Sequence, residues 1–98
     1  MSMLFWNVRG MNKKGRRKDI KNHINKYHLS VIGLLETKVK SSKAERITGC
    51  IPSTWSYCAN YEFSNKGRIW VFWDEAIWTG SVVSTSLQQI TIKMQNKI

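Results

Sequence analysis

The chain has 98 residues and a mass of 11.4 kDa, which allows one small domain with a limited core and excludes a second domain. A hydrophobic fraction of 42% with five Trp argues against disorder. Sixteen Lys and Arg against six Asp and Glu give a formal charge of +10. This excess favours a polyanionic partner, with nucleic acid ahead of an anionic membrane surface, over the alternative of a generic basic protein.

The cysteines and the N-terminus bear on the compartment. Cys50 and Cys58 form no C-x-x-C pair, and neither His23 nor His28 lies at a zinc-site spacing from them. We expect two reduced thiols. The N-terminus has no basic region followed by an apolar stretch, and no run reaches the roughly 18 apolar residues of a membrane helix. We therefore expect a soluble intracellular protein, with a nuclear location open.

The first third of the chain predicts a strand, a helix and a second strand. Residues 3–8 form an apolar run that fits a buried strand, and a Gly-bounded polar loop follows over residues 10–15. From Arg16, the apolar positions Ile20, Ile24 and Tyr27 share one helical face that should pack on a sheet. The cations of this helix should then face solvent: Arg16, Arg17, Lys18 and Lys21. Residues 30–35 read as a second buried strand, so a βαβ crossover should make the two strands parallel.

The remaining residues have mostly β character. Residues 37–53 read as a polar, Lys-rich loop with a short helix near residues 43–48. Strands are expected over residues 55–61, 68–73, 77–84 and 88–94. Turns at residues 65–67 and 74–76 would join the first three of these strands as hairpins. The pattern predicts a meander that continues the same sheet.

Two polar residues follow the two parallel strands. Asn7 lies at the C-terminal end of the first strand and Glu36 at that of the second, on the sheet edge where α/β proteins bind ligands. An amide oxygen and a carboxylate are hard ligands that suit Mg²⁺. Read from spacing alone, a solvated loop carboxylate is the more common explanation, so metal binding stands as a hypothesis.

Basic residues begin beside the same edge. They could hold a phosphate backbone, although most charge runs are simply solvated faces. They are Arg9, Lys13, Lys14, Arg16, Arg17, Lys18 and Lys21. His23 and His28 are expected to be surface or packing residues rather than general bases. Trp70, Trp73 and Trp78 could stack bases, but packing is the preferred interpretation for most of them.

Three segments together resemble a known family. Residues 5–10 (FWNVRG), the basic helix and residues 31–38 (VIGLLETK) are similar to the two opening motifs of the endonuclease/exonuclease/phosphatase superfamily, which has the DNase I-like fold. Residues 67–74 (GRIWVFWD) resemble a segment of the endonuclease domain of plant LINE-type non-LTR retrotransposons. The resemblance covers nearly the whole chain. It implies that residues 1–98 are the N-terminal portion of such a domain.

The resemblance implies a site and a fold. Glu36 would be the principal ligand of Mg²⁺ or Mn²⁺, Asn7 would help to hold it, and Lys38 would lie near metal and phosphate. The nucleic-acid contacts would be Arg9, Lys13, Lys14, Arg16, Arg17 and Lys38. The fold would be of the α/β (α+β) class, a partial DNase I-like sandwich with one sheet, its helix and a β-meander. The second half of the sandwich would be missing, leaving an exposed apolar face.

This sequence departs from the family in several places. Leu35 stands where many relatives have Gln, and Arg9 where apurinic-site endonucleases have Asp. The later Gly-Asp-x-Asn and Ser-Asp-His motifs, which supply the family's general base, do not occur in these residues. No complete catalytic set is therefore present.

Three functions remain open. The preferred one is a truncated or degenerate retrotransposon endonuclease domain, inactive alone, with DNA and the rest of the nuclease domain or polyprotein as partners. The second is a small basic nucleic-acid-binding protein. The third is a fragment of a phosphatase of the same fold.

Overall fold

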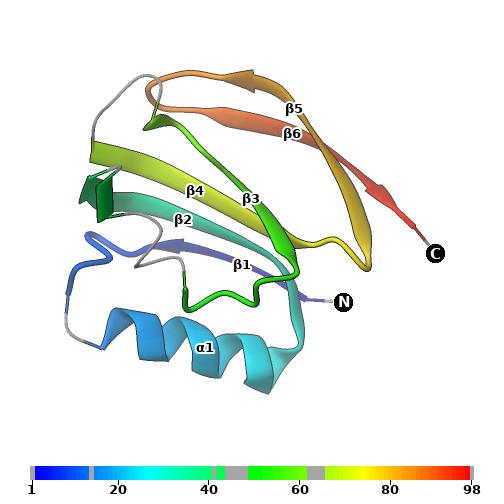
Figure 1. Ribbon diagram of the computed structural model, residues 1–98, viewed down its shortest axis with the longest axis horizontal. Helices are drawn as coiled ribbons and strands as arrows, with labels where there is room; N and C mark the ends of the chain where they lie inside the picture. The colour runs from blue at the N-terminus through cyan, green and yellow to red at the C-terminus, as the bar shows by residue number, and fades with distance from the viewer. Residues whose placement is uncertain (1, 14, 41, 44–48, 62–65, 98) are drawn as a thin grey trace.

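The protein consists of one helix and two β-sheets (Figure 1). The computed structural model describes residues 2–13, 15–40, 42–43, 49–61 and 66–97. The elements are β1 (Ser2–Asn7), α1 (Arg16–Tyr27), β2 (Leu29–Lys40), β3 (Trp55–Ala59), β4 (Lys66–Asp74), β5 (Trp78–Thr85) and β6 (Ile90–Asn96). A four-stranded sheet has the order β1-β2-β4-β3, and β5 and β6 form a separate two-stranded sheet. Figure 1 shows α1 and the β5–β6 hairpin on opposite sides of the larger sheet.

The expected strand–helix–strand unit is confirmed. Strands β1 and β2 are parallel, with Asn7 opposite Leu35. Helix α1 begins at Arg16, directly after Gly15, whose φ of 88° suits glycine. It ends at Tyr27, and the next residue, His28, adopts a left-handed conformation and donates its backbone N–H to the carbonyl of Ile24. Because the two strands are parallel, the C-terminal ends of β1 and β2 lie at the same edge of the sheet.

The expected helix face is only partly correct. Ile20 is fully buried and Ile24 half-buried, but Tyr27 is 48% exposed. The His23 ring lies 6.0 Å from the Trp6 ring and 5.7 Å from the Tyr27 ring, so histidine takes the place on the sheet and Tyr27 stays outside it. The tyrosine prediction was therefore wrong.

The expected meander was also wrong. Strand β4 lies between β2 and β3 and pairs with residues 31–35 of β2, and again with residues 39 and 40, because β2 runs on to Lys40. Residues 66 and 67 belong to β4 rather than to a turn, and Asn65 lies outside the described residues, as does nearly all of the helix expected at 43–48. Antiparallel pairing of β3 with β4 is confirmed.

Strand β5 leaves the larger sheet and crosses over it. The Asp74 side chain accepts the backbone N–H of Ala76 at 2.9 Å, and this turn redirects the chain. A Cβ at Gly80 would lie 2.6 Å from the Trp73 ring, so the glycine lets β5 pass directly over that indole. Trp78 Nε1 donates to Ser30 Oγ at 3.1 Å. The expectation of a single sheet is thus corrected: β5 and β6 begin a second layer.

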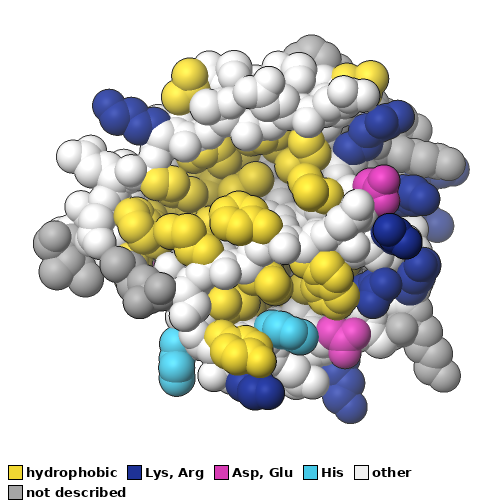
Figure 2. Space-filling model, turned by 180° about the vertical axis from the view of Figure 1, so that it is seen from behind, with side chains coloured by type: hydrophobic (Ala, Val, Ile, Leu, Met, Phe, Trp, Pro, Cys, Tyr) yellow, Lys and Arg dark blue, Asp and Glu magenta, His cyan; other side chains and the backbone are white. Residues whose placement is uncertain are grey.

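The core lies mainly between α1 and the larger sheet, around fully buried residues of β2 and β4 such as Ile32, Leu34 and Trp70. The other face of β1 and β2 is largely uncovered, with Met3 49%, Phe5 68% and Leu35 42% exposed. Figure 2 shows hydrophobic side chains gathered between the hairpin and the helix on that side. The resemblance implied an exposed apolar face; Met3, Phe5 and Leu35 are exposed, whereas Trp73 is covered by β5.

The two cysteines are free thiols. Cys50 is buried, Cys58 is half-buried, and no disulfide joins them. In the described part of the chain, no helix has the length and apolar character that crossing a membrane requires.

Candidate metal and phosphate site at the end of strand β1

The chain segments that follow β1 and interrupt β2 are joined into one unit, here called the clamp, which comprises residues 8–12 and 35–38. Four hydrogen bonds hold it together. They run from the backbone N–H of Val8 to the Leu35 carbonyl (3.0 Å), Gly10 to Glu36 (2.7 Å) and Met11 to Thr37 (2.8 Å), and from Asn12 Nδ2 to the Lys38 carbonyl (3.2 Å). The clamp therefore extends the contact between the two strands beyond their paired residues.

The core anchors the clamp from below. Val8, Met11, Thr37 and the adjoining Val39 are each at most 1% exposed. They alternate with polar residues whose side chains are exposed, namely Arg9, Glu36 and Lys38. This alternation fixes the backbone through the buried residues and leaves the charged side chains on the surface.

Backbone strain is concentrated in the clamp. Arg9 has a φ of 50°, and Glu36 and Lys38 each have a φ of 55°; besides these, His28 is the only non-glycine residue with positive φ in the described part. A left-handed conformation costs about 1–2 kcal/mol for such residues. Strain of this kind persists where surrounding bonds enforce it, and it is characteristic of functional sites.

Asn7 and Glu36 lie on neighbouring strands, as expected. Asn7 pairs with Leu35, so Glu36 is one residue further along a strand about 4.8 Å away. Glu36 was expected at the end of the second strand, and this was wrong. Glu36 lies inside β2, where the register of the strand shifts between Leu35 and Val39. Both side chains are exposed, and neither forms a hydrogen bond or ion pair within the described residues. They are accessible to a ligand.

The donor set fits a hard cation that retains much of its water. Asn7 and Glu36 offer an amide oxygen and a carboxylate, the kinds of ligand that Mg²⁺ accepts together with water and substrate phosphate. The described residues contain no group of three or more His, Cys, Asp or Glu that could bind a metal ion as a set. These residues fit Mg²⁺ or Mn²⁺ as a partial site with open positions.

The expected phosphate contacts have different environments. Arg9, Lys13, Arg17 and Lys38 are exposed, whereas Lys14 lies outside the described residues. Arg16 was expected to face solvent, and this was wrong. Its guanidinium lies 4.9 Å from the centroid of the Trp6 ring, and its Nε donates to the Val8 carbonyl at 3.1 Å. The cation–π contact and the open carbonyl draw Arg16 onto β1, where it supports the clamp.

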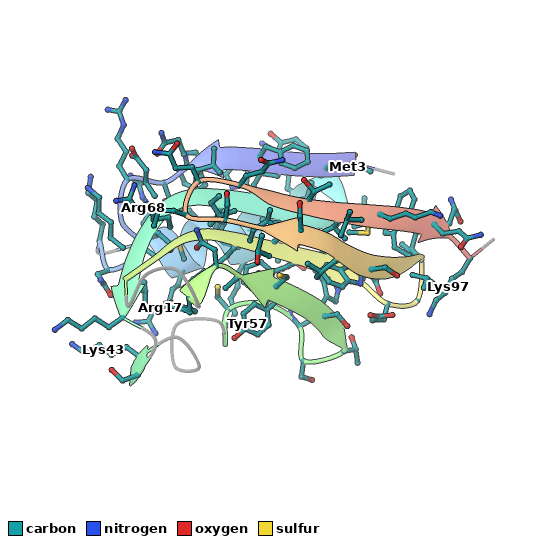
Figure 3. All side chains as sticks on the ribbon, turned by 90° about the horizontal axis from the view of Figure 1, so that it is seen from above. Met3, Arg17, Lys43, Tyr57, Arg68 and Lys97 are labelled. Atoms are coloured by element: carbon teal, nitrogen blue, oxygen red, sulfur yellow. The ribbon has the colours of Figure 1, made fainter. Side chains whose placement is uncertain are left out.

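The sequence interpretation missed Arg68 as a site residue. The pairs Leu35–Ile69 and Val39–Gly67 leave Arg68 as the β4 residue opposite the shifted segment 36–38. Figure 3 shows Arg68, Arg17 and Lys43 at the same end of the molecule, away from Met3 and Lys97. Finding Arg68 required the knowledge that β4, and not β3, adjoins β2.

His23 and three tryptophans have packing roles. His23 Nδ1 lies 2.7 Å from the Asp19 carbonyl, and its ring packs near Trp6. Trp70 is fully buried and donates Nε1 to the Tyr61 hydroxyl at 3.3 Å. Trp73 is also buried, and Trp78 is half-buried with its Nε1 bonded to Ser30. The preference for packing over base stacking is confirmed for these indoles.

The resemblance to the endonuclease/exonuclease/phosphatase superfamily rests on the motifs around Asn7, Glu36 and residues 67–74. Comparison of the sequence with models of known families gives no match, and comparison with curated proteins also gives none.

Proposed function

We propose that this chain is the N-terminal part of a retrotransposon-type endonuclease domain, and that it binds a divalent cation and DNA phosphate without cleaving DNA alone. The observation that carries the proposal is the clamp. Hydrogen bonds and buried anchors hold Glu36 and Lys38 in strained conformations with their side chains exposed. Structural stability alone does not require this strain.

Each part of the site has a defined task in this proposal. Glu36 and Asn7 would hold Mg²⁺ or Mn²⁺, which when bound would polarise a phosphate oxygen and neutralise developing charge. Lys38 and Arg68 flank Glu36 by register, and Arg9 follows Asn7 directly. These cations would position the phosphate backbone, as Arg and Lys do in most DNA-binding proteins.

The absence of turnover follows from the side chains available. Hydrolysis needs a group that takes a proton from the attacking water. The 98 residues contain neither a Gly-Asp-x-Asn nor a Ser-Asp-His motif. His23 lies on the helix with its ring packed near Trp6, and His28 ends the helix. In this proposal the chain supplies binding and orientation, and the motifs that carry the family's general base are missing from it.

Titration of the purified chain with Mg²⁺ or Mn²⁺, followed by Trp fluorescence, tests the metal site. We expect saturable binding that weakens at least tenfold in Glu36→Gln, because the proposed carboxylate ligand is lost. Asp19→Asn, which removes an exposed carboxylate from α1, is the matched control and should bind like the wild type. An equal loss in both variants, or no response in the wild type, contradicts the proposal. Plasmid cleavage that depends on Glu36 would contradict the absence of turnover.

A second candidate is a nucleic-acid-binding protein that needs no metal. The exposed cations at the end of β1 favour it, because they are sufficient for salt-dependent binding. DNA binding that is unchanged by EDTA and by Glu36→Gln, but lost in Arg9→Ala with Arg68→Ala, would favour this candidate. Binding of a small phosphorylated ligand in preference to DNA would instead favour the phosphatase of the same fold.

A further inference from the structure

A groove lies on the helix side of the larger sheet, beside α1. The helix packs against β1 and β2, and strands β4 and β3 beside them are only partly covered by residues 49–53. The groove has a volume of about 770 Å³. Its lining includes Tyr57, Phe72 and Trp55 from the sheet and Lys21 and Ile24 from the helix.

A second hollow, of about 540 Å³, continues the groove toward the start of the helix. The two hollows share Lys21, Gly49 and Cys50, and the second is also lined by Arg17 and Lys18. No Asp or Glu is among the described residues that line either hollow. The combined surface is thus aromatic at one end and cationic at the other.

The groove orients the ring of Tyr57 and keeps the thiol of Cys50 protonated. The Tyr57 ring is stacked on the Phe72 ring, with centroids 5.4 Å apart and planes 21° from parallel. Phe72 is 2% exposed and Tyr57 46% exposed, so a buried ring orients an exposed one. Burial raises the pKa of the Cys50 thiol above its ordinary value, although Arg17 and Lys21 oppose this. The thiol therefore adds no negative charge to the groove at neutral pH.

We propose that this groove binds a nucleotide unit of single-stranded nucleic acid, with a base stacked on Tyr57 and a neighbouring phosphate held by Lys21 and Arg17. The inference rests on the proposed function for the class of partner, but it does not involve Asn7, Glu36 or a metal ion. An aromatic surface next to cations is the combination by which proteins bind single strands. A base within a duplex has no free face to offer to Tyr57.

Binding of a fluorescent ten-residue thymidine oligonucleotide, measured by anisotropy in EDTA, tests the groove. Tyr57→Leu should weaken binding about tenfold, because it keeps apolar bulk but removes the stacking ring. Tyr57→Phe should bind like the wild type. Tyr27→Leu is the matched control, because Tyr27 is 48% exposed and outside the groove, and it should also bind normally.

The cationic end has its own test. Lys21→Ala should reduce the slope of log affinity against log salt by about 0.7, the value for one phosphate contact on a single strand. Lys93→Ala removes an exposed lysine of β6 and should leave the slope unchanged. Far-ultraviolet circular dichroism of each variant should match the wild type, and Tyr57→Phe provides a folded reference at the same position.

The outcomes separate this inference from the metal site. Equal effects of Tyr57→Leu and Tyr27→Leu, or stronger binding of duplex than of single strand, would overturn the groove as a single-strand site. So would binding to vesicles of anionic lipid with no binding of the oligonucleotide. Loss of the metal response in the wild type, with the Tyr57 and Lys21 effects intact, would overturn the metal proposal and leave the groove standing.

Discussion

Glu36 in β2 and Glu75 in the turn after β4 are both partly or fully exposed carboxylates, and their surroundings differ completely. The Glu75 carboxylate accepts hydrogen bonds from Ser56 Oγ and Trp73 Nε1 and lies 3.6 Å from Lys97 Nζ. The Glu36 carboxylate has no partner in the described part of the chain, although Lys38 and Arg68 are neighbours by sequence and register. Only the backbone of Glu36 is held, through its carbonyl bond to Gly10.

The two carboxylates therefore have different roles. Glu75 joins β3, the end of β4 and Lys97, so its side chain contributes to stability. Glu36 adds strain through its φ of 55° and offers its oxygens to solvent. Substitution of a polar side chain that has hydrogen-bond partners should therefore lower stability. Substitution of a clamp side chain without such partners should instead weaken ligand binding.

Asn60 is the extreme case of a satisfied polar group and should give the largest effect. It is fully buried, accepts the backbone N–H groups of Arg68 and Ile69, and donates to the carbonyls of Ser86 and Leu87. Asn60→Ala leaves these groups unpaired and should lower the free energy of unfolding by about 2–4 kcal/mol. Urea denaturation measures this change.

Ser86→Ala is the control for Asn60→Ala, because it removes an exposed hydroxyl but keeps the carbonyl that Asn60 binds. It should change the free energy of unfolding by no more than about 0.5 kcal/mol. Similar losses in the two variants would show that the hairpin, and not the Asn60 bonds, determines the stability.

Lys38→Gly should stabilise the protein while weakening its binding. Glycine relieves about 1–2 kcal/mol of left-handed strain. It also makes the unfolded chain more flexible, and this lowers the free energy of unfolding by about 0.5–1 kcal/mol. The free energy of unfolding should rise by about 0.5–1 kcal/mol on balance. DNA affinity should fall because one cation is lost. A less stable variant would mean that the Lys38 side chain supports the clamp.

The smallest effect concerns pH and Glu75. The hydrogen bond from Ser56, with further help from Trp73 and Lys97, lowers the pKa of Glu75 below its ordinary value. A lowered pKa in the folded state stabilises the protein above the unfolded pKa, near 4.3, and this contribution is lost as pH falls through the folded pKa. Glu75→Gln should therefore have a lower Tm than the wild type at pH 7. The difference should shrink toward pH 3, and a constant difference would contradict this origin.

The local elements could be predicted from the sequence because their signals are local. The apolar run of β1, the helix from Arg16 and the buried run that opens β2 each have a period or composition of their own. The placement of Asn7 and Glu36 on neighbouring strands followed from the crossover rule. The metal and DNA ligands themselves stay predictions.

The remaining features depend on tertiary contacts. The insertion of β4 between β2 and β3 depends on which strand completes β2, and no hairpin signal encodes this choice. The departure of β5 depends on the fit of Trp73 against Gly80. The left-handed Glu36 and Lys38 could not be foreseen, because neither residue type favours that conformation. Arg16 was misplaced because the Val8 carbonyl and Trp6 attract it.

The strand order β1-β2-β4-β3 also has a consequence for synthesis on the ribosome. Strand β3 emerges before its partner β4, and β2 presents an unpaired edge until β4 has followed it. Residues 29–40 include the apolar run of β2, so a nascent chain exposes an aggregation-prone strand during this interval. Slow translation between residues 41 and 66 would prolong this exposure, and a chaperone that binds extended apolar segments would act there.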